Sequence, residues 1–343
     1  MRLGIIARSD NTGLGNQTRE LVKMLNPSKI LLIDSTYFNG NDQHPNWYSG
    51  YEVITTKGFA NDAEMMNFLD GIDVVISCEI FYNSRLISYC KQKGIKTILQ
   101  YNYEFLDNLQ NLNLDLPDVL VSPSTWNIDN VIKFFGKDCK VIHLPPPSDF
   151  ELFKNNREAN LSTDHKRILH VAGKIAAKDR NGTDTVIEML KYSKADYELV
   201  IKVQKGQIIE SKDPRLTISY NSPENREDLY KDFDAMILPR RYAGLCLPMN
   251  EALMSGLPVF MTDISPNNAV LPPEWLVETS VIDVLMTRTL LDIHNADPMK
   301  MAQLIDNYIN NSNKTNWKQK AVEIGYFNFA VENLKDKYLE LLG

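Results

Sequence analysis

The chain has 343 residues, about twice the usual length of one domain, so two domains of comparable size are expected. Its composition, 43% hydrophobic and 24% charged with 16 Gly and 16 Pro, excludes disordered, collagen-like and coiled-coil proteins. The 37 Lys and Arg against 44 Asp and Glu give a net charge of −7, which argues against a protein that binds phosphate backbones over a wide surface. A local basic pocket is compatible with this charge.

The cysteines and the apolar runs predict a cytoplasmic protein without a membrane span. Cys78, Cys90, Cys139 and Cys246 are widely spaced and form no C-x-x-C pair, so we expect reduced thiols and no metal site. The first apolar run, residues 3–7, is too short for a signal peptide. No window approaches the roughly 18 apolar residues that a spanning helix needs.

The first half alternates short apolar runs with helical patterns, which predicts a doubly wound α/β unit. Most runs are continuous rather than alternating, as buried parallel strands are. The predicted strands are residues 3–8, 29–34, 52–55, 73–77, 96–100, 118–122 and 140–144. The predicted helices include residues 17–25, 63–69, 83–92 and 125–135.

A proline run at 145–147 and a polar stretch at 154–166 interrupt this pattern and predict a linker without helix or strand. A second α/β series follows, with strands at 167–172, 198–203, 216–220, 235–238 and 258–261 and helices at 183–190, 226–231 and 249–255. The tail, 314–342, is predicted to be helical. We therefore expect one domain at 1–149, a linker at 150–166 and a second domain at 167–325.

The loop at 9–16, after the first strand, is the first candidate ligand site. Gly13 and Gly15 let a backbone approach a ligand closely, and a helix that begins at Asn16 would direct free N–H groups at a negative group. It is neither G-x-G-x-x-G nor a P-loop. A plain strand-to-helix turn is the alternative.

The loop at 171–183 follows the first strand of the second series and holds three cations, Lys174, Lys178 and Arg180. Together with its glycines they suit a diphosphate, whose charge needs neutralising. The alternative is a solvated loop with incidental charge.

The segment at 235–263 is the most informative. A strand ends at Pro239, a glycine-containing loop leads to a helix that holds Glu251, and Gly256 ends that helix before the next strand. A carboxylate in an early helical turn can be a charge–dipole feature. Glu251 could instead accept both hydroxyls of a ribose.

This segment resembles the signature of the retaining glycosyltransferases of the GT-B fold, in particular family four. The signature runs from a strand ending in Pro-Ser, through Glu-Gly-Phe-Gly-Leu-Pro, to Glu-Ala, Ala-x-Gly-x-Pro-Val and Thr-Asp. Here it reads Pro239-Arg240, then 243–248, Glu251-Ala252, 254–259 and Thr262-Asp263. The resemblance implies an α/β protein of two Rossmann-like doubly wound parallel-sheet domains that face a central cleft.

Other segments agree with the resemblance. Gly13-Leu-Gly15 is similar to the family's N-terminal glycine loop, and Gly173-Lys174 with Arg180-Asn-Gly182 is similar to its phosphate-binding pair. Residues 326–329 resemble the start of the final helix, which in the family crosses back onto the N-terminal domain. By this resemblance residues 326–343 belong with the first domain.

Two departures from the family pattern stand out. The first signature glutamate, which in relatives touches the transferred sugar, falls on Ala243, with Arg240, Arg241 and Tyr242 beside it. Lys174 replaces the usual Arg, and the spacing to Arg180 is one residue longer than in the family. Lys178 is therefore a competing assignment for the second phosphate cation.

The resemblance implies transfer of a sugar from a nucleotide diphosphate sugar to an acceptor hydroxyl, with retention of anomeric configuration and with no metal or other cofactor. Lys174 and Arg180 would stabilise the leaving diphosphate as catalytic residues. Glu104 is an acceptor-side candidate, with a solvated acid as the alternative. The expected donor-binding residues are Gly13, Gly15, Arg241, Gly244, Leu245, Glu251, Asn267 and Asn268.

Two rival functions fit the same architecture, a nucleotide-sugar epimerase and a protein that binds nucleotide sugars without turnover. The acceptor stays open between a saccharide, a protein, a lipid and a modified nucleic-acid base, which the net charge disfavours. The sequence predicts neither the donor base and sugar nor the oligomeric state.

Overall fold

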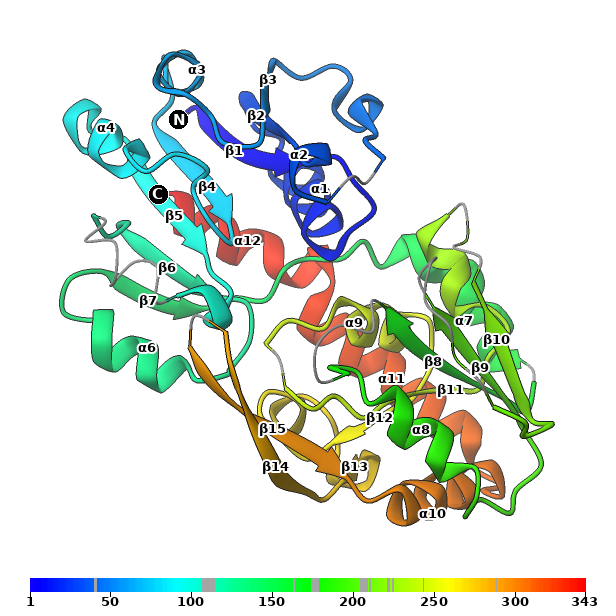
Figure 1. Ribbon diagram of the computed structural model, residues 1–343. Helices are drawn as coiled ribbons and strands as arrows, with labels where there is room; N and C mark the ends of the chain where they lie inside the picture. Colours follow the sequence, from blue (N-terminus) through cyan, green and yellow to red (C-terminus); the bar gives the residue numbers. More distant parts are fainter. Residues whose placement is uncertain are drawn as a thin grey trace. The chain divides into compact units, whose positions relative to one another are not determined.

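The computed structural model describes residues 1–39, 42–106, 115–162, 164–173, 179–203, 209, 211–220, 223, 225–242, 244–287 and 289–343. They form two compact units. Unit 1 comprises Met1–Ser148, Thr287–Thr289 and Val331–Gly343, and unit 2 comprises Asp149–Met286 and Leu290–Ala330. Figure 1 shows a β-sheet with helices packed around it in each unit.

The described part of unit 1 contains a seven-stranded sheet in the order β3-β2-β1-β4-β5-β6-β7, with parallel pairing throughout. Its strands are β1 (Leu3–Arg8), β2 (Lys29–Asp34), β3 (Val53–Lys57), β4 (Val74–Cys78), β5 (Lys96–Gln100), β6 (Val119–Ser122) and β7 (Lys140–His143). Its helices are α1 (Gly13–Leu25), α2 (Thr36–Asn39), α3 (Asp62–Phe68), α4 (Leu86–Lys93), α6 (Ile128–Phe135) and α12 (Val331–Leu342), with 3₁₀ helices at Pro45–Tyr48 and Tyr103–Phe105.

Both faces of this sheet are covered, because successive residues of a strand point to opposite faces. In β1, Ile6 packs in a core cluster with residues of α3 and α4, whereas Ile5 packs in a second cluster with α1 and α12. In α12, Tyr338 adds a polar anchor, since its hydroxyl accepts a hydrogen bond from Gln100 Nε2 at 3.0 Å. The C-terminal helix is thereby an integral part of unit 1.

The described part of unit 2 contains a six-stranded parallel sheet in the order β10-β9-β8-β11-β12-β13 and a separate antiparallel ribbon, β14-β15. The strands are β8 (Arg167–Gly173), β9 (Glu198–Val203), β10 (Leu216–Ser219), β11 (Ala235–Leu238), β12 (Val259–Thr262), β13 (Leu276–Val277), β14 (Thr279–Met286) and β15 (Leu290–Ala296). The helices are α7 (Lys154–Ser162), α8 (Thr183–Met189), α9 (Leu247–Met254), α10 (Pro298–Ile309) and α11 (Lys314–Phe329), with 3₁₀ helices at Glu151–Phe153, Arg226–Tyr230, Asn267–Ala269 and Pro273–Trp275.

The expectation that residues 154–166 lack regular structure is wrong, because α7 occupies most of that stretch. Its buried face is polar and bonds main-chain carbonyls: Asn156 Nδ2 donates to Glu227 O, and Asn160 Nδ2 donates to Tyr230 O and Ser255 O. Buried polar groups need such partners, and here the fold supplies them. A hydropathy pattern cannot reveal a helix that buries asparagines.

Two further expectations need correction. The helix predicted at 226–231 is a 3₁₀ helix, and the helical tail is two helices, separated by Ala330 with extended backbone angles. Val331, which begins α12, donates its N–H to Ser148 O at 3.2 Å, so α12 starts beside the last residue of the first segment of unit 1. The ribbon β14-β15 and helix α10 were not predicted.

A buried ion pair joins α11 to the sheet of unit 2. Lys318 Nζ lies 2.7 Å from Asp234 Oδ1 and also donates to Asn160 O at 2.7 Å. The Asp234 carboxylate accepts further hydrogen bonds from the main-chain N–H groups of His165 and Arg167. Removing one member of such a pair leaves a buried charge without compensation, which is strongly destabilising.

We predict that Lys318→Ala lowers the free energy of unfolding of unit 2 by about 3–5 kcal/mol, measured by urea denaturation. The matched control is Lys320→Ala on the same helix, where an exposed ion pair with Glu274 should contribute less than about 1 kcal/mol. Equal effects of the two substitutions would contradict the prediction.

Candidate functional site

The order of strands in unit 2 identifies one edge as the place for a ligand. Strand β8 pairs with β9 on one side and with β11 on the other, so the chain reverses its direction of winding between β8 and β11. In open parallel sheets ligands bind outside the carboxyl ends of the strands at such a switch point. The loops that follow β8 and β11 therefore form the candidate site, and both had been singled out from the sequence.

The two loops are joined by close backbone contacts. Arg241 N donates to Arg180 O at 2.9 Å. Gly182 has a φ of +69°, and a Cβ at this position would lie 2.4 Å from Pro239 O. Only glycine fits there, because a side chain would force the loops apart.

Arg241 adds a side-chain link to this junction. Its Nη2 lies 2.5 and 2.7 Å from the two carboxylate oxygens of Asp184, in the first turn of α8, and 3.2 Å from Asn295 Oδ1 of β15. Burial opposes ionisation of Asp184, but the hydrogen bonds and charge of Arg241 hold the pKa of that carboxyl below its ordinary value. The structure thus places Arg241 as a cross-link, and its contact with a donor stays a prediction.

Arg180 is exposed at this junction, and its guanidinium carbon lies 6.0 Å from the ring centroid of Tyr242. Its neighbour Asn181 holds the loop to the end of β8 by donating to Val171 O and Ala172 O. Lys174, Lys178 and Ala243 lie outside the described residues. The choice between Lys178 and Arg180 as second cation is therefore still a prediction.

Arg240 is a site residue that the sequence prediction left out. Its side chain is buried, Nη1 donates to Leu245 O at 2.9 Å, and no partner of Nε lies in the part of the chain that the structure describes. Gly244 and Leu245, two predicted donor-binding residues, stand in the same loop between β11 and α9. One feature of the sequence could have identified it, because Arg240 stands where the family signature has a serine.

Glu251 is buried in α9, with a partner on each carboxylate oxygen. The Tyr230 hydroxyl donates to Oε2 at 2.6 Å, and Arg226 Nε lies 3.2 Å from Oε1. The carboxylate is therefore oriented by protein groups, and ribose hydroxyls would have to share or displace them. Its ribose contact remains a prediction.

Asn267 and Asn268, two predicted donor-binding residues, lie in the 3₁₀ helix Asn267–Ala269 after β12. Asn267 is buried, and its Nδ2 donates to Thr262 O at 3.0 Å, whereas Asn268 Nδ2 donates to Asp263 Oδ1 at 3.0 Å. These side chains fix the turn after β12. A three-residue 3₁₀ helix lacks the aligned dipole of an α-helix N-terminus.

The buried side chain of His170, in β8, links this strand to β11 and to the start of α8. Its Nδ1 lies 2.9 Å from Ile237 O, and Nε2 lies 3.0 Å from Thr183 Oγ1 at the start of α8. Because a carbonyl only accepts, Nδ1 carries the proton, and Nε2 accepts from the threonine hydroxyl. Complete burial lowers the pKa of His170 to about 4.

In unit 1 the corresponding switch point lies between β1 and β4. The predicted glycine loop is shorter than expected, because α1 begins at Gly13, with Thr12 as its N-cap. A Cβ on Gly15 would lie 2.0 Å from Asp10 O, so this glycine is needed for the close packing of its own loop. Gly13 is exposed, and contact of either glycine with a donor is untested.

Asp10 is the centre of this packing. Fully buried, it accepts from Arg8 Nη2 at 2.7 Å, from Thr12 N at 3.1 Å and from the hydroxyls of Thr12 and Ser35. Burial opposes ionisation, but these hydrogen bonds and Arg8 keep the pKa of Asp10 below its ordinary value. The carboxylate therefore ties the loops after β1 and β2 together.

Glu104, the acceptor-side candidate, lies half-buried in the 3₁₀ helix after β5. Its main-chain carbonyl accepts a hydrogen bond from the Thr287 hydroxyl at 3.3 Å. This contact involves the main chain alone, so both the acceptor-side role and the solvated acid stay predictions.

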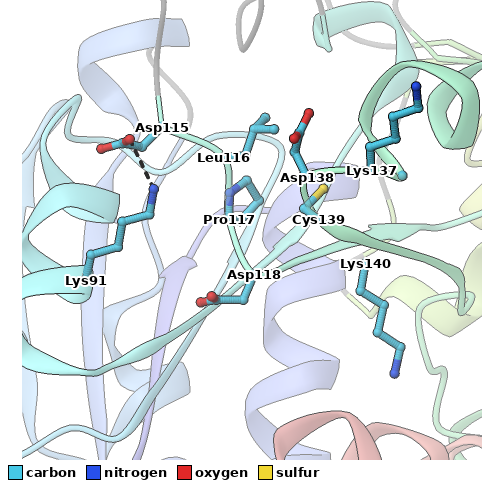
Figure 2. Close-up of a pocket in the computed structure, with 10 residues that line it drawn as sticks. Lys91, Asp115, Leu116, Pro117, Asp118, Lys137, Asp138, Cys139 and Lys140 are labelled. Atoms are coloured by element: carbon cyan, nitrogen blue, oxygen red, sulfur yellow. Dashed lines mark hydrogen bonds and ion pairs between the residues drawn. The ribbon is translucent and has the colours of Figure 1, made fainter.

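A separate pocket of about 680 Å³ lies at the opposite edge of unit 1, where β6 and β7 begin (Figure 2). Figure 2 shows Asp115 paired with Lys91 at 3.1 Å on one side, and Lys137 and Asp138 on the other. It lies at the amino ends of the strands, so it does not coincide with either switch point. No residue of this pocket had been predicted as functional.

Within the described residues, no group of His, Cys, Asp or Glu has an arrangement that could hold a metal ion. None of the helices in this part of the chain is long and apolar enough to cross a membrane.

No protein-family model and no curated protein matches the chain. Solved structures match it over nearly its full length. Sucrose-phosphate synthase from Thermosynechococcus elongatus aligns with a TM-score of 0.67 at 13% identity, over 99% of this chain and 98% of that one. HepE of Anabaena, in complex with UDP-glucose, gives 0.68 at 10% identity, over 100% and 99%. A glycosyltransferase from Rickettsia africae gives 0.65 at 12%, over 99% and 97%.

At these identities the likeness shows the fold. The chain has the two-domain Rossmann-like fold of the GT-B glycosyltransferases, which confirms the fold that the signature predicted.

We predict that Gly15→Ala lowers the free energy of unfolding by about 1–3 kcal/mol, because the added methyl group overpacks the loop against Asp10. Inside a helix the same substitution ordinarily stabilises, by up to about 1 kcal/mol. Urea denaturation gives the sign of the change in the free energy of unfolding. The control is Gly13→Ala, on the exposed side of the same turn. A stabilising Gly15→Ala would refute the close-packing role.

We predict that stability falls on acidification as His170 is forced to ionise. The unfolded histidine binds protons from its ordinary pKa of 6.5 downward, the folded one only near 4, so stability is complete above pH 6.5 and is lost towards pH 4. The loss from this residue is about 3 kcal/mol between pH 7 and pH 4. Urea denaturation at several pH values measures it, and His170→Gln should show a shallower pH dependence. An unchanged slope in the variant would contradict this assignment.

Proposed function

We propose that this protein is a retaining glycosyltransferase that moves a sugar from a nucleotide diphosphate sugar to an acceptor hydroxyl without a bound metal. The observation that carries the proposal is the joined pair of loops at the switch point of unit 2, with Arg180 exposed and Arg240 buried beside it. The net charge of the protein is −7, so arginines gathered at this one edge favour a ligand with negative charge there.

The structural relatives support the donor class. HepE has been solved with UDP and with UDP-glucose, and its fold matches this chain from end to end. We infer that a UDP-sugar binds at the loops after β8 and β11. Glu251 would accept the ribose hydroxyls, and Gly244, Leu245, Asn267 and Asn268 would line the same edge. Gly13 and Gly15, in the loop after β1, stay predicted donor-binding residues.

The chemistry follows from the bond that must break. The acceptor oxygen forms a bond to the anomeric carbon as the bond from that carbon to the diphosphate oxygen breaks, and the acceptor proton passes to the departing diphosphate. Negative charge grows on the diphosphate in the transition state, so fixed cations there lower the barrier. Lys174 and Arg180 would supply this charge, and Arg241, held by Asp184, would keep their loop in place.

The first glutamate of the family signature falls on Ala243 in this chain. Retention therefore cannot be explained by a carboxylate nucleophile at that position. We therefore propose attack by the acceptor on the same face of the sugar from which the diphosphate leaves. The free, buried cysteines agree with a protein that works in the cytoplasm.

We predict that Arg180→Ala lowers kcat/KM for donor turnover by on the order of 10²-fold, because a donor to the developing anion is lost. The assay incubates UDP-glucose and other UDP-sugars with neutral saccharides in the presence of EDTA and follows UDP release. The anomeric configuration of the product is read by proton NMR.

Lys191→Ala, an exposed lysine on the same unit beyond α8, is the matched control and should be near normal. A near-normal kcat/KM of Arg180→Ala would contradict the role assigned to Arg180. Loss of activity with EDTA that Mn²⁺ restores would contradict metal independence. A product of inverted configuration would contradict retention. Isomerised donor sugar without an acceptor would identify an epimerase, and binding without turnover a nucleotide-sugar-binding protein.

A further inference from the structure

An aromatic pair stands at the carboxyl edge of unit 1. Tyr103 follows β5 and Trp126 follows β6, and these strands are neighbours in the sheet (Figure 1). Their ring centroids lie 5.2 Å apart at an interplanar angle of 61°, an edge-to-face contact. Both side chains are only half-buried.

Core packing accounts for one ring and not for the other. Tyr103 packs against the core cluster that contains Leu99 and Leu120. Trp126 belongs to none of the core clusters of the described residues. The largest side chain of the loop is thus kept at the surface, at the edge of a parallel sheet where ligands bind.

The backbone around the pair is fixed. The Thr289 and Thr287 hydroxyls, which belong to the same unit, donate to Tyr103 O at 3.4 Å and Glu104 O at 3.3 Å. On the other loop, Trp126 N donates to Ser124 Oγ at 3.3 Å. Asn127 has a φ of +52°, a strained conformation for a residue other than glycine. The rings are therefore held in a preset position.

The two loops that carry the rings have few charges. Residues 101–106 and 122–128 contain no Lys or Arg, and Glu104 is their single charged residue. Nucleic acids and anionic lipid headgroups are bound mainly through cations, which these two loops do not provide. Arg288, between Thr287 and Thr289, lies outside the described residues. Next to the rings in sequence, Asn102, Ser124, Thr125 and Asn127 carry side chains that both donate and accept hydrogen bonds.

We propose that the Tyr103–Trp126 pair binds a neutral saccharide acceptor. A sugar ring has an apolar face of C–H groups, which packs on an aromatic ring, and a rim of hydroxyls, which needs polar partners. That this saccharide is an acceptor rests on the proposed glycosyl transfer. Binding of the saccharide itself does not require turnover. The inference selects the saccharide among the four acceptor classes that the sequence left open.

The test measures saccharide binding to the full chain by saturation-transfer NMR and calorimetry, with maltose, cellobiose, lactose and N,N′-diacetylchitobiose as probes. We expect at least one of them to bind, with Trp126→Ala weakening the affinity on the order of tenfold. Trp126→Phe keeps an aromatic ring and should stay within about threefold. Trp47→Phe is the matched control, a second half-buried tryptophan of unit 1 in another loop, and should leave affinity unchanged.

UDP binding and UDP-glucose turnover are measured on the same samples, and thermal melts verify that the variants are folded. If UDP binds and no disaccharide does, or if Trp126→Ala binds as well as the original chain, the inference is overturned. It is also overturned if anionic vesicles or a single-stranded oligonucleotide bind through Trp126. If disaccharides bind through Trp126 and UDP does not bind, the proposed function fails while the saccharide site stands.

Discussion

The ion pair between Arg241 and Asp184 is the contact on which the candidate site depends. It joins the loop after β11 to the first turn of α8, and the Arg241 main chain extends the link, since its carbonyl accepts from His294 N of the ribbon at 2.9 Å. A half-buried pair of this kind, with bonds to both carboxylate oxygens, restrains geometry more than it adds net stability. Three elements that are remote in sequence thereby hold the loop that carries Arg180.

Parallel topology explains why these contacts gather at one edge. All carboxyl ends of a parallel sheet lie on the same side, so the edge holds Gly173 at the end of β8, Pro239 after β11 and Thr262 at the end of β12. The same rule in unit 1 brings together Asp10, Tyr103 and Trp126 along the carboxyl edge. Each unit thus presents one polar edge with buried organising groups beneath it.

Apart from β13, the strands of both sheets could be predicted from the sequence, because continuous apolar runs of strand length have few other uses in a globular protein. Helix α7 could not be predicted, since Asn156, Arg157 and Asn160 bond main-chain carbonyls that, with one exception, lie 70 to 97 positions away in the sequence. The ribbon β14-β15 was missed for a related reason. Its sequence does not alternate cleanly, and Val281, Ile282, Val284, Met286 and Leu290 are exposed.

The site shows the same division between local and tertiary information. Glycine-containing loops and cations at strand ends are local signals, and in unit 2 they point to the loops that follow β8 and β11. The sequence could not show that Gly15 is needed by Asp10, that Glu251 already has partners in Tyr230 and Arg226, or that Arg240 is buried. These facts depend on residues brought together only by folding.

Hydrogen exchange measured with and without UDP reports where the nucleotide binds without assuming turnover. If UDP binds where we propose, exchange slows in the loops after β8 and β11 and at the start of α9 when UDP is added. Protection confined to the pocket at the amino ends of β6 and β7, or no change after β8 and β11, would contradict it.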